Sequence, residues 1–337
     1  MARLAVIGAG AWGINHVRVI AAEASCELAA VVDPDPRAMQ AVRAVAPRAK
    51  IVAAVDDVLA DPSIDAVVIA SPAATHVSLA CAALEAGKAV LVEKPLAMNA
   101  ADARRVVATA ARQGRVAMVG HLMLHHPAVL RLRDLLQSGQ LGTLHYLHCT
   151  RVNLGKLRRD ENALWSFGPH DLSMCDLLLG DVPRTVTARG QCVLQPGIED
   201  VVFLTMRYAT GELAHVHLSW LSPRKERRLT LVCSQKMAEF DDVAPDKLRI
   251  YNKGYESPPS FTEYGQYLVL RDGDVHIPQI SMEEPLRVQL QHFLESLETG
   301  TPVRGDLASA LRITRTLEAA QLSLERDGAP VEVDQSL

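Results

Sequence analysis

The chain begins with a short apolar run that leads directly into three closely spaced glycines. Residues 3–7 read RLAVI and predict a buried strand, and Gly8, Gly10 and Gly13 follow in the order G-x-G-x-x-G. Gly8 permits a tight turn, Gly10 lets the backbone approach a pyrophosphate, and Gly13 lets the next helix pack on the strand. The start of that helix offers unpaired N–H groups to phosphates. The segment therefore predicts the first strand, turn and helix of a dinucleotide-binding fold.

A second apolar strand, residues 28–32, ends at Asp33, 20 residues after Gly13. A carboxylate at this place accepts hydrogen bonds from the ribose hydroxyls of the adenosine and repels a 2′-phosphate, so it favours NAD over NADP. Arg37 follows nearby and leaves NADP as the alternative, because an arginine can accommodate the extra phosphate.

Apolar strand patterns and helical patterns alternate through the first third of the chain. The predicted elements after Asp33 are residues 37–46, 50–54, 64–70, 75–85, 89–93, 100–113 and 116–120. Such alternation is typical of a parallel sheet covered by helices on both faces. The sequence therefore predicts a doubly wound Rossmann domain, which binds NAD, over residues 1–121.

Strand patterns predominate after residue 142, with a helix predicted at 164–179 and two more at 286–299 and 307–327. This order predicts a second α/β domain over residues 122–337, with an open, mainly antiparallel sheet and helices on one face. We expect the second domain to supply the substrate wall and to mediate oligomerisation, and the C-terminal helix to be able to pack back on the first domain.

Composition narrows the class of protein. The chain has 337 residues, 49% of them hydrophobic and 22% charged, which fits a soluble globular protein of two domains. A net charge of −4 without long runs of one sign argues against nucleic acid or a membrane surface as partner. The six cysteines include no C-x-x-C pair, and no leader or membrane span is recognisable. We therefore expect a cytoplasmic protein without a disulfide framework.

Glu93, Lys94 and Pro95 stand at the end of a predicted parallel strand, where open α/β sheets bind their ligands. Lys94 at this edge can reach a hydroxyl or carbonyl beside the nicotinamide, and Pro95 restricts its backbone to extended conformations. The alternative is a surface lysine with a solvated ammonium group.

His170 and Asp171 follow Gly168 and Pro169 at the front of the predicted helix 164–179. A histidine with a pKa near neutrality is the usual proton carrier in alcohol oxidation. A histidine packed against backbone at a helix start is an equally good interpretation.

The polar segment 153–162 precedes that helix and contains Lys156, Arg158 and Arg159. Three cations beside a site can bind an anionic group such as a diphosphate, although a solvated loop is the simpler interpretation. His215 and His217 share one face of a predicted strand, but no third ligand is evident, so no metal site is expected.

Together these features resemble the glucose-fructose oxidoreductase / inositol dehydrogenase / rhizopine-catabolism (Gfo/Idh/MocA) family of NAD(P)-dependent sugar dehydrogenases, over essentially the whole chain. The resemblance is carried by the glycine motif, Ser71-Pro72, His76, Gly87-Lys88, Glu93-Lys94-Pro95, Gly120-His121 and His170. It implies a Rossmann domain and an α/β domain whose open sheet lines the active site and often makes subunit contacts. It also implies that Lys94 and His170 serve catalysis, and we expect a homodimer or homotetramer because an exposed open sheet usually needs a covering surface.

The expected site residues follow from these motifs and the resemblance. Those expected to bind the cofactor are Gly8, Gly10, Ala11, Trp12, Gly13, Asp33, Ser71, Pro72, His76, Glu93 and Lys94. Those expected to bind the substrate are Lys94, His121, Asn153, Arg158, Arg159, Asn162, Trp165, His170 and Asp171.

The chain departs from the family pattern around the expected catalytic histidine. Many members carry aspartates four residues before and three residues after it, where this chain has Ser166 and Ser173. The departure puts the Lys–Asp–His arrangement of the inositol type in doubt and leaves a Lys–His pair. The stretch from Asn153 to Asp171 instead resembles the branch that oxidises C3 of nucleotide-linked amino sugars. That resemblance implies oxidation of UDP-N-acetylglucosamine, or of its uronate, toward a 3-amino sugar for lipid A.

Several alternatives remain open. They are a free-sugar or inositol dehydrogenase of the same family, an imine or biliverdin-type reductase, and a non-enzymatic regulator that senses NAD. Whether Lys94 or His170 takes the proton is also open, because burial beside a dinucleotide can lower the pKa of a lysine.

Overall fold

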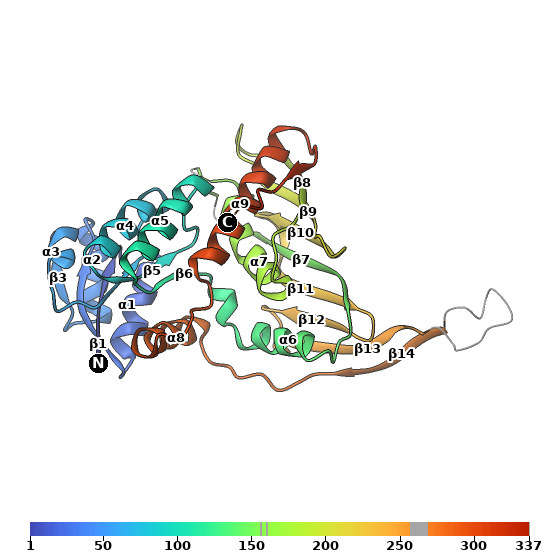
Figure 1. Ribbon diagram of the computed structural model, residues 1–337, viewed down its shortest axis with the longest axis horizontal. Coiled ribbons are helices and arrows are strands. Elements are labelled where there is room, and N and C mark those ends of the chain that lie inside the picture. The colour runs from blue at the N-terminus through green and yellow to red at the C-terminus, as the bar shows by residue number, and fades with distance from the viewer. Residues whose placement is uncertain (156, 160, 257–268, 337) are drawn as a thin grey trace. The chain divides into compact units, whose positions relative to one another are not determined.

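The computed structural model describes residues 1–155, 157–159, 161–256 and 269–336. The chain divides into two compact units, and Figure 1 shows the elements of both. One comprises Met1–His125 and Glu283–Arg315, and the other comprises His126–Met282 and Thr316–Leu337. Each unit therefore joins segments that lie far apart in the sequence.

The first unit is built on a six-stranded sheet with the order β3-β2-β1-β4-β5-β6, in which all neighbouring strands are parallel. Its strands are β1 (Ala2–Ile7), β2 (Cys26–Val32), β3 (Lys50–Val52), β4 (Ala66–Ile69), β5 (Ala89–Glu93) and β6 (Ala117–Gly120). Its helices are α1 (Gly13–Ala22), α2 (Pro36–Val45), α3 (Val55–Leu59), α4 (His76–Glu85), α5 (Ala100–Gln113) and α8 (Pro285–Thr299), with 3-10 turns η1 (Ala73–Thr75) and η2 (Leu122–His125). The predicted Rossmann fold is confirmed, and its strand order reverses between β1 and β4, where such sheets bind their ligands.

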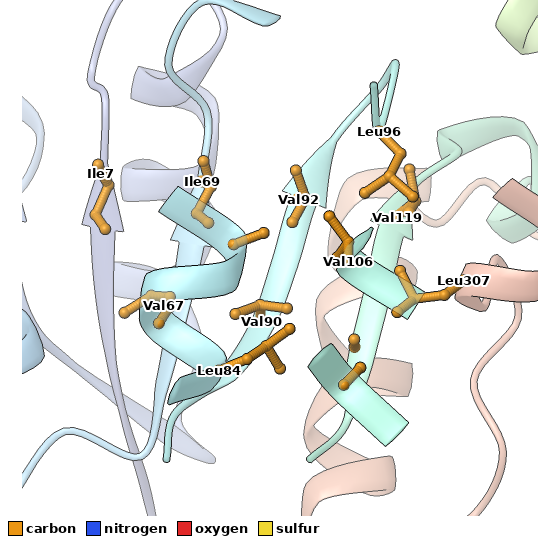
Figure 2. Packing of buried hydrophobic residues seen from close by; sticks show 14 of the residues in the cluster. Ile7, Val67, Ile69, Leu84, Val90, Val92, Leu96, Val106, Val119 and Leu307 are labelled. Atoms are coloured by element: carbon orange, nitrogen blue, oxygen red, sulfur yellow. The ribbon is translucent and has the colours of Figure 1, made fainter. Parts of the chain in front are cut away.

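Two apolar layers cover this sheet, one on each face. Figure 2 shows the first layer, in which side chains of the central strands pack against α4, α5 and Leu307. Its labelled members are Ile7, Val67, Ile69, Leu84, Val90, Val92, Leu96, Val106, Val119 and Leu307. The second layer joins the opposite face to α1 and to α8, which contributes Leu286, Leu290, Phe293 and Leu294. Strands buried on both faces are nearly continuous apolar runs, which explains the lack of alternation in their sequences.

The second unit contains a nine-stranded sheet with the order β14-β13-β12-β11-β7-β10-β9-β8-β15. Its strands are β7 (Leu144–Leu154), β8 (Thr185–Gln191), β9 (Val201–Arg207), β10 (Leu213–Ser219), β11 (Leu221–Cys233), β12 (Met237–Asp241), β13 (Leu248–Glu256), β14 (Val269–His276) and β15 (Val331–Glu332). Its neighbouring strands are antiparallel, apart from the parallel pair β7 and β10. The predicted open, mainly antiparallel sheet is confirmed.

Helices α6 (Pro127–Gln137) and α7 (Ala163–Leu179) belong to this unit, and α9 (Leu307–Glu325) runs from the first unit into the second. Along β9 and β10 every second residue is buried, and α7 packs on β7, β9 and β10 (Figure 1). The alternate residues, including Phe203 and His215, are partly exposed. This alternation is what an antiparallel sheet with one covered face requires.

Two strands of this sheet lie outside the strand patterns of the sequence, which cover residues 143–153, 184–193, 200–208, 212–221, 227–233, 237–240 and 247–251. β14 reads VLRDGDVH, and its two aspartates and glycine are residue types depleted in strands. It forms all the same because it pairs with β13 at the edge of the sheet. The other is the two-residue β15, which pairs with β8. In the described part of the chain, no helix has both the length and the apolar character needed to cross a membrane.

Candidate cofactor and active site

The three glycines after β1 differ in whether the structure would tolerate a side chain at their positions. Gly8 has φ +91°, and a Cβ on Gly13 would lie 2.0 Å from the carbonyl oxygen of Gly8, so the turn itself requires both glycines. A Cβ on Gly10, in contrast, would meet nothing within 4 Å. The turn therefore leaves open space over Gly10, where the sequence motif places a pyrophosphate, and the residues present fit a dinucleotide.

Asp33 follows β2 and is anchored beside the same turn. Its Oδ2 accepts a hydrogen bond from the backbone N of Ala9 at 2.7 Å, and its Oδ1 accepts one from Asp35 N at 2.8 Å. The carboxylate is thus fixed at the end of β2 by backbone donors, in the place that suits the adenosine ribose. Arg37 lies in the first turn of α2 and is exposed.

His76 joins the backbone after β4 to the backbone after β5. Its ring is buried, with Nε2 2.9 Å from the carbonyl oxygen of Ser71 and Nδ1 2.8 Å from that of Pro95. Ser71 Oγ lies 2.7 Å from Thr75 Oγ1, in the segment that contains Pro72. Both ring nitrogens of His76 therefore contact protein backbone. We expect His76 to support cofactor binding indirectly, by fixing the segments that follow β4 and β5.

Lys94 is half-buried at the end of β5, and its peptide bond to Pro95 is cis. The preceding carboxylate, Glu93, is buried and accepts hydrogen bonds from Trp12 Nε1 and His16 Nε2, each at 2.7 Å. Burial raises the pKa of Glu93, but the hydrogen bonds from His16 and Trp12 and the charge of Lys94 bring it below its ordinary value. Glu93 is therefore ionised at neutral pH.

His121 follows β6, whose Gly120 is paired with Glu93 of β5. His121 is 2% exposed, and neither ring nitrogen has a hydrogen-bond partner among the described residues. Burial, together with the nearby charge of Lys94, lowers the pKa of His121 to about 4, although Glu93 opposes the shift. His121 is therefore a neutral imidazole beside Lys94 at neutral pH.

In the second unit, Asn162 begins α7. Its Oδ1 accepts a hydrogen bond from Trp165 N at 3.1 Å, and its Nδ2 donates to Glu199 Oε2 and to Gln321 Oε1. Trp165 is 7% exposed. The resemblance implied that both residues bind substrate. In the structure, the side chain of Asn162 binds other protein groups, and Trp165 is buried.

His170 is half-buried on α7, and the hydroxyl of Ser173 donates to its carbonyl oxygen at 2.8 Å. The next residue, Asp171, is 1% exposed and bound by Arg151 of β7, with Nε 2.6 Å from Oδ2 and Nη2 3.2 Å from Oδ1. Burial raises the pKa of Asp171, and the guanidinium of Arg151 opposes the rise. Asp171 thus anchors the turn of helix that carries His170 to the sheet.

The predicted diphosphate-binding segment is only partly described, because Lys156 lies outside the described residues. Asn153 is half-buried on β7, and Arg158 and Arg159 are exposed. Arg158 Nε lies 3.4 Å from a carboxylate oxygen of Glu161, which holds this arginine only loosely. Both guanidinium groups therefore remain accessible to an anion.

Sequence reasoning missed two residues that organise these sites, His16 and Arg151. His16 is 77 residues from its partner Glu93, and Arg151 is 20 residues from Asp171. The sequence offers only weak signals for them: His16 is a polar residue on the apolar helix α1, and Arg151 is a charged residue within a β-strand. Among the described residues, no group of three or more His, Cys, Asp or Glu side chains is arranged to hold a metal ion.

Comparison with known proteins agrees with the fold of both units. The sequence profile of the oxidoreductase family with an NAD-binding Rossmann fold matches residues 2–121, and that of the GFO/IDH/MocA C-terminal domain matches residues 129–239. Inositol 2-dehydrogenase 2 of Saccharopolyspora erythraea is 33% identical over 222 residues, which cover 64% of this chain and 66% of that enzyme, just under two thirds of its length.

Two other relatives are similar over nearly the whole chain. UDP-N-acetylglucosamine 3-dehydrogenase of Acidithiobacillus ferrooxidans is 29% identical, with 94% of this chain and 97% of that enzyme covered. The crystal structure of GenD2 from gentamicin A biosynthesis, in complex with NAD, has a TM-score of 0.82 and 26% identity, with 99% of this chain and 96% of that chain covered. With both units matched and the glycine turn suited to the dinucleotide, the chain belongs to the Gfo/Idh/MocA family of NAD-binding oxidoreductases.

Proposed function

We propose that this protein oxidises the C3 hydroxyl of a nucleotide-linked amino sugar, UDP-N-acetylglucosamine, to the 3-keto form. NAD⁺, when bound, accepts the hydride. Of the chain's own residues, His170 takes the hydroxyl proton as general base, and Lys94 donates a hydrogen bond to the same oxygen and stabilises the developing alkoxide. The reverse assignment, with Lys94 as base, uses the same two residues.

The observation that carries the choice of substrate lies on α7. Many members of the family are expected to carry aspartates at the positions of Ser166 and Ser173, and both serines are buried here. The carboxylate next to His170, Asp171, is bound by Arg151 instead. A Lys–His pair without an aspartate at position 166 or 173 therefore favours the nucleotide-sugar branch over the inositol branch.

The exposed arginines support the same choice. We assign Arg158 and Arg159 to the diphosphate, because guanidinium groups bind phosphate oxygens in pairs. Asn153 and His121 are assigned to the sugar, His121 because its neutral ring can both donate and accept. Asn162, Trp165 and Asp171 support the site by shaping α7.

The product, a 3-keto amino sugar, is a substrate for an aminotransferase, so the proposal places the reaction before a 3-amino sugar of lipid A in the cytoplasm. We also expect a homodimer or homotetramer through the open sheet. Tyr146 and Phe203 on its uncovered side are 45% and 46% exposed, more than large aromatic residues usually are. Light scattering during gel filtration tests this, and a monomer would contradict it.

The substrate is tested by NADH formation with UDP-N-acetylglucosamine, its uronate, UDP-glucose, free N-acetylglucosamine and myo-inositol. A trapping aminotransferase removes the ketone, since its formation is expected to be unfavourable. Turnover confined to UDP-amino sugars supports the proposal. Turnover of myo-inositol or of free sugars would overturn the substrate and favour the second candidate, an inositol or free-sugar dehydrogenase, which the 33% identity to inositol 2-dehydrogenase 2 supports. NAD binding without any turnover would favour a regulator.

A further inference from the structure

The buried carboxylate of Glu93 gathers hydrogen bonds from two separate parts of the cofactor unit. Trp12, between Gly10 and Gly13 in the glycine turn, donates through Nε1, and His16 of α1 donates through Nε2, both to Oε1 at 2.7 Å. The other oxygen, Oε2, accepts from the backbone N of Lys94 at 3.2 Å. One side chain thus links the glycine turn, helix α1 and the residue expected to act in catalysis.

The neighbouring strand is shaped to admit this carboxylate. Gly120 of β6 is paired with Glu93, and a Cβ at Gly120 would lie 2.9 Å from Oε1 and 3.1 Å from Oε2. Any larger residue at position 120 would therefore displace the carboxylate. The glycine, which has no positive φ to explain it, is explained by the space that Glu93 occupies.

Burying an ionised carboxylate in this position costs desolvation free energy, which hydrogen-bond donors must offset. Glu93 is 7% exposed, and its carboxylate is ionised. An ionised carboxylate is stable in such a buried place only while its hydrogen-bond donors stay in position. An apolar residue would close the end of β5 at less cost. The arrangement therefore points to a requirement that Trp12, His16 and Lys94 keep fixed positions.

The residue on the other side of Lys94 is anchored as well. The carbonyl of Pro95 lies 2.8 Å from His76 Nδ1, and His76 also reaches the carbonyl of Ser71 after β4. Lys94 is consequently held between two fixed neighbours at the sheet edge. Movement of the glycine turn and movement of Lys94 are then coupled through Glu93.

We propose that Glu93 is a positioning residue that locks the glycine turn, through Trp12 and His16, to the backbone of Lys94, and thereby sets the affinity for NAD. Trp12 contributes its indole N–H to this lock although 43% of its surface is exposed. The inference depends on NAD binding alone and holds whichever sugar is oxidised, so it can fail or succeed independently of the proposed substrate.

The test measures NAD⁺ binding by isothermal titration calorimetry, with the full-length protein and no sugar present. W12F keeps an aromatic ring and removes the N–H, and we expect it to raise the Kd for NAD⁺ by about tenfold. H16A should weaken binding to a similar extent, whereas H16Q, which retains a donor, should recover part of the loss. E93Q should weaken binding most, because all three donors lose the charge they face.

The matched control is W220F in the second unit. Trp220 also donates through Nε1 to a buried aspartate, Asp200, so this variant loses the same kind of bond far along the chain from the glycine turn. We expect W220F to lower the melting temperature and to leave the Kd for NAD⁺ within about twofold of wild type. If E93Q does not fold, W12F and the pair H16A and H16Q carry the test. Wild-type NAD⁺ affinity in folded W12F and H16A would overturn the proposal.

Discussion

The guanidinium of Arg151 holds the carboxylate of Asp171, the residue next to His170, through two hydrogen bonds of 2.6 and 3.2 Å. Arg151 comes from β7 and Asp171 from α7, and both are nearly inaccessible to solvent. The pair therefore fixes the helix that carries the expected catalytic histidine to the sheet beneath it. Its removal has consequences for stability that can be measured apart from activity.

Replacement of Arg151 by Met should destabilise the protein by about 3–5 kcal/mol, because it leaves the Asp171 carboxylate buried without its partner. The free energy of unfolding in urea measures this. R3M is the control, since Arg3 and Glu27 form an exposed pair whose loss should cost less than about 1 kcal/mol. Equal losses in R151M and R3M would show that the buried pair is not structural.

Substitutions at two glycines of the turn should separate binding from folding. G10A should fold with a stability within about 1 kcal/mol of wild type, because its Cβ meets open space, and should lose NAD⁺ affinity by about tenfold or more. G13A should be destabilised by about 3 kcal/mol, because its Cβ would overlap the carbonyl oxygen of Gly8. Calorimetric titration and urea unfolding measure the two effects. Undiminished NAD⁺ binding by G10A would contradict the placement of the pyrophosphate.

Asp33 should determine the choice between NAD and NADP. D33S removes the charge that we expect to face the ribose, so the ratio of affinities for NAD⁺ and NADP⁺ should fall by at least about tenfold. D35S is the control, because Asp35 caps α2 through Arg37 N and serine can cap as well. A ratio that stays constant in D33S would remove Asp33 from the ribose site.

Stability should fall in mild acid because several buried histidines must be protonated on unfolding. The folded-state pKa of His121 is lowered to about 4 and that of His125 lies well below its ordinary value of 6.5, both mainly through burial. The unfolded chain then binds more protons than the folded one between these values. Each such group therefore stabilises the fold above pH 6.5, and this contribution is lost as the pH falls toward the folded pKa.

For His121 alone, the free energy of unfolding should change by about 1.2 kcal/mol between pH 6 and pH 5. H121Q should reduce the pH dependence of the unfolding free energy by about that amount, whatever its effect on stability at neutral pH. Urea titrations at several pH values measure the slope. An unchanged slope in H121Q would mean that His121 titrates normally in the folded protein.

Lys94 and His170 should both be needed for turnover and not for the fold. K94A and H170N should each lower kcat by about 10²–10⁴-fold, the range usual for groups that handle a proton or stabilise an alkoxide. H145N, at an exposed position of β7, is the control for a histidine outside the site. Turnover near that of wild type in both K94A and H170N would rule out the pair.

Local patterns in the sequence predicted much of the fold. The turn around Gly8 and Gly13, the parallel strands and helix α7 were predicted because each depends on neighbours close in the chain. Strand β14 could not be predicted in this way, since its pairing with β13 outweighs an unfavourable composition. The cofactor motif was equally local, and the structure adds the open space above Gly10.

The contacts that position the site residues were beyond prediction. Nothing in one sequence pairs His16 with Glu93 or Arg151 with Asp171, because folding alone brings these residues together. Asn162 illustrates the reverse case. The resemblance to the nucleotide-sugar branch implied a substrate ligand at this position, and the structure adds that its oxygen caps α7 and its amide binds Glu199 and Gln321.

The central claim, oxidation at C3 of UDP-N-acetylglucosamine, is tested most directly with substrate that carries deuterium at C3. The enzyme is incubated with this compound and NAD⁺, and both products are analysed by mass spectrometry. Our account predicts deuterium in the reduced nicotinamide and a ketone that has lost it. Reduced nicotinamide without deuterium, formed while the sugar keeps its label, would contradict oxidation at C3.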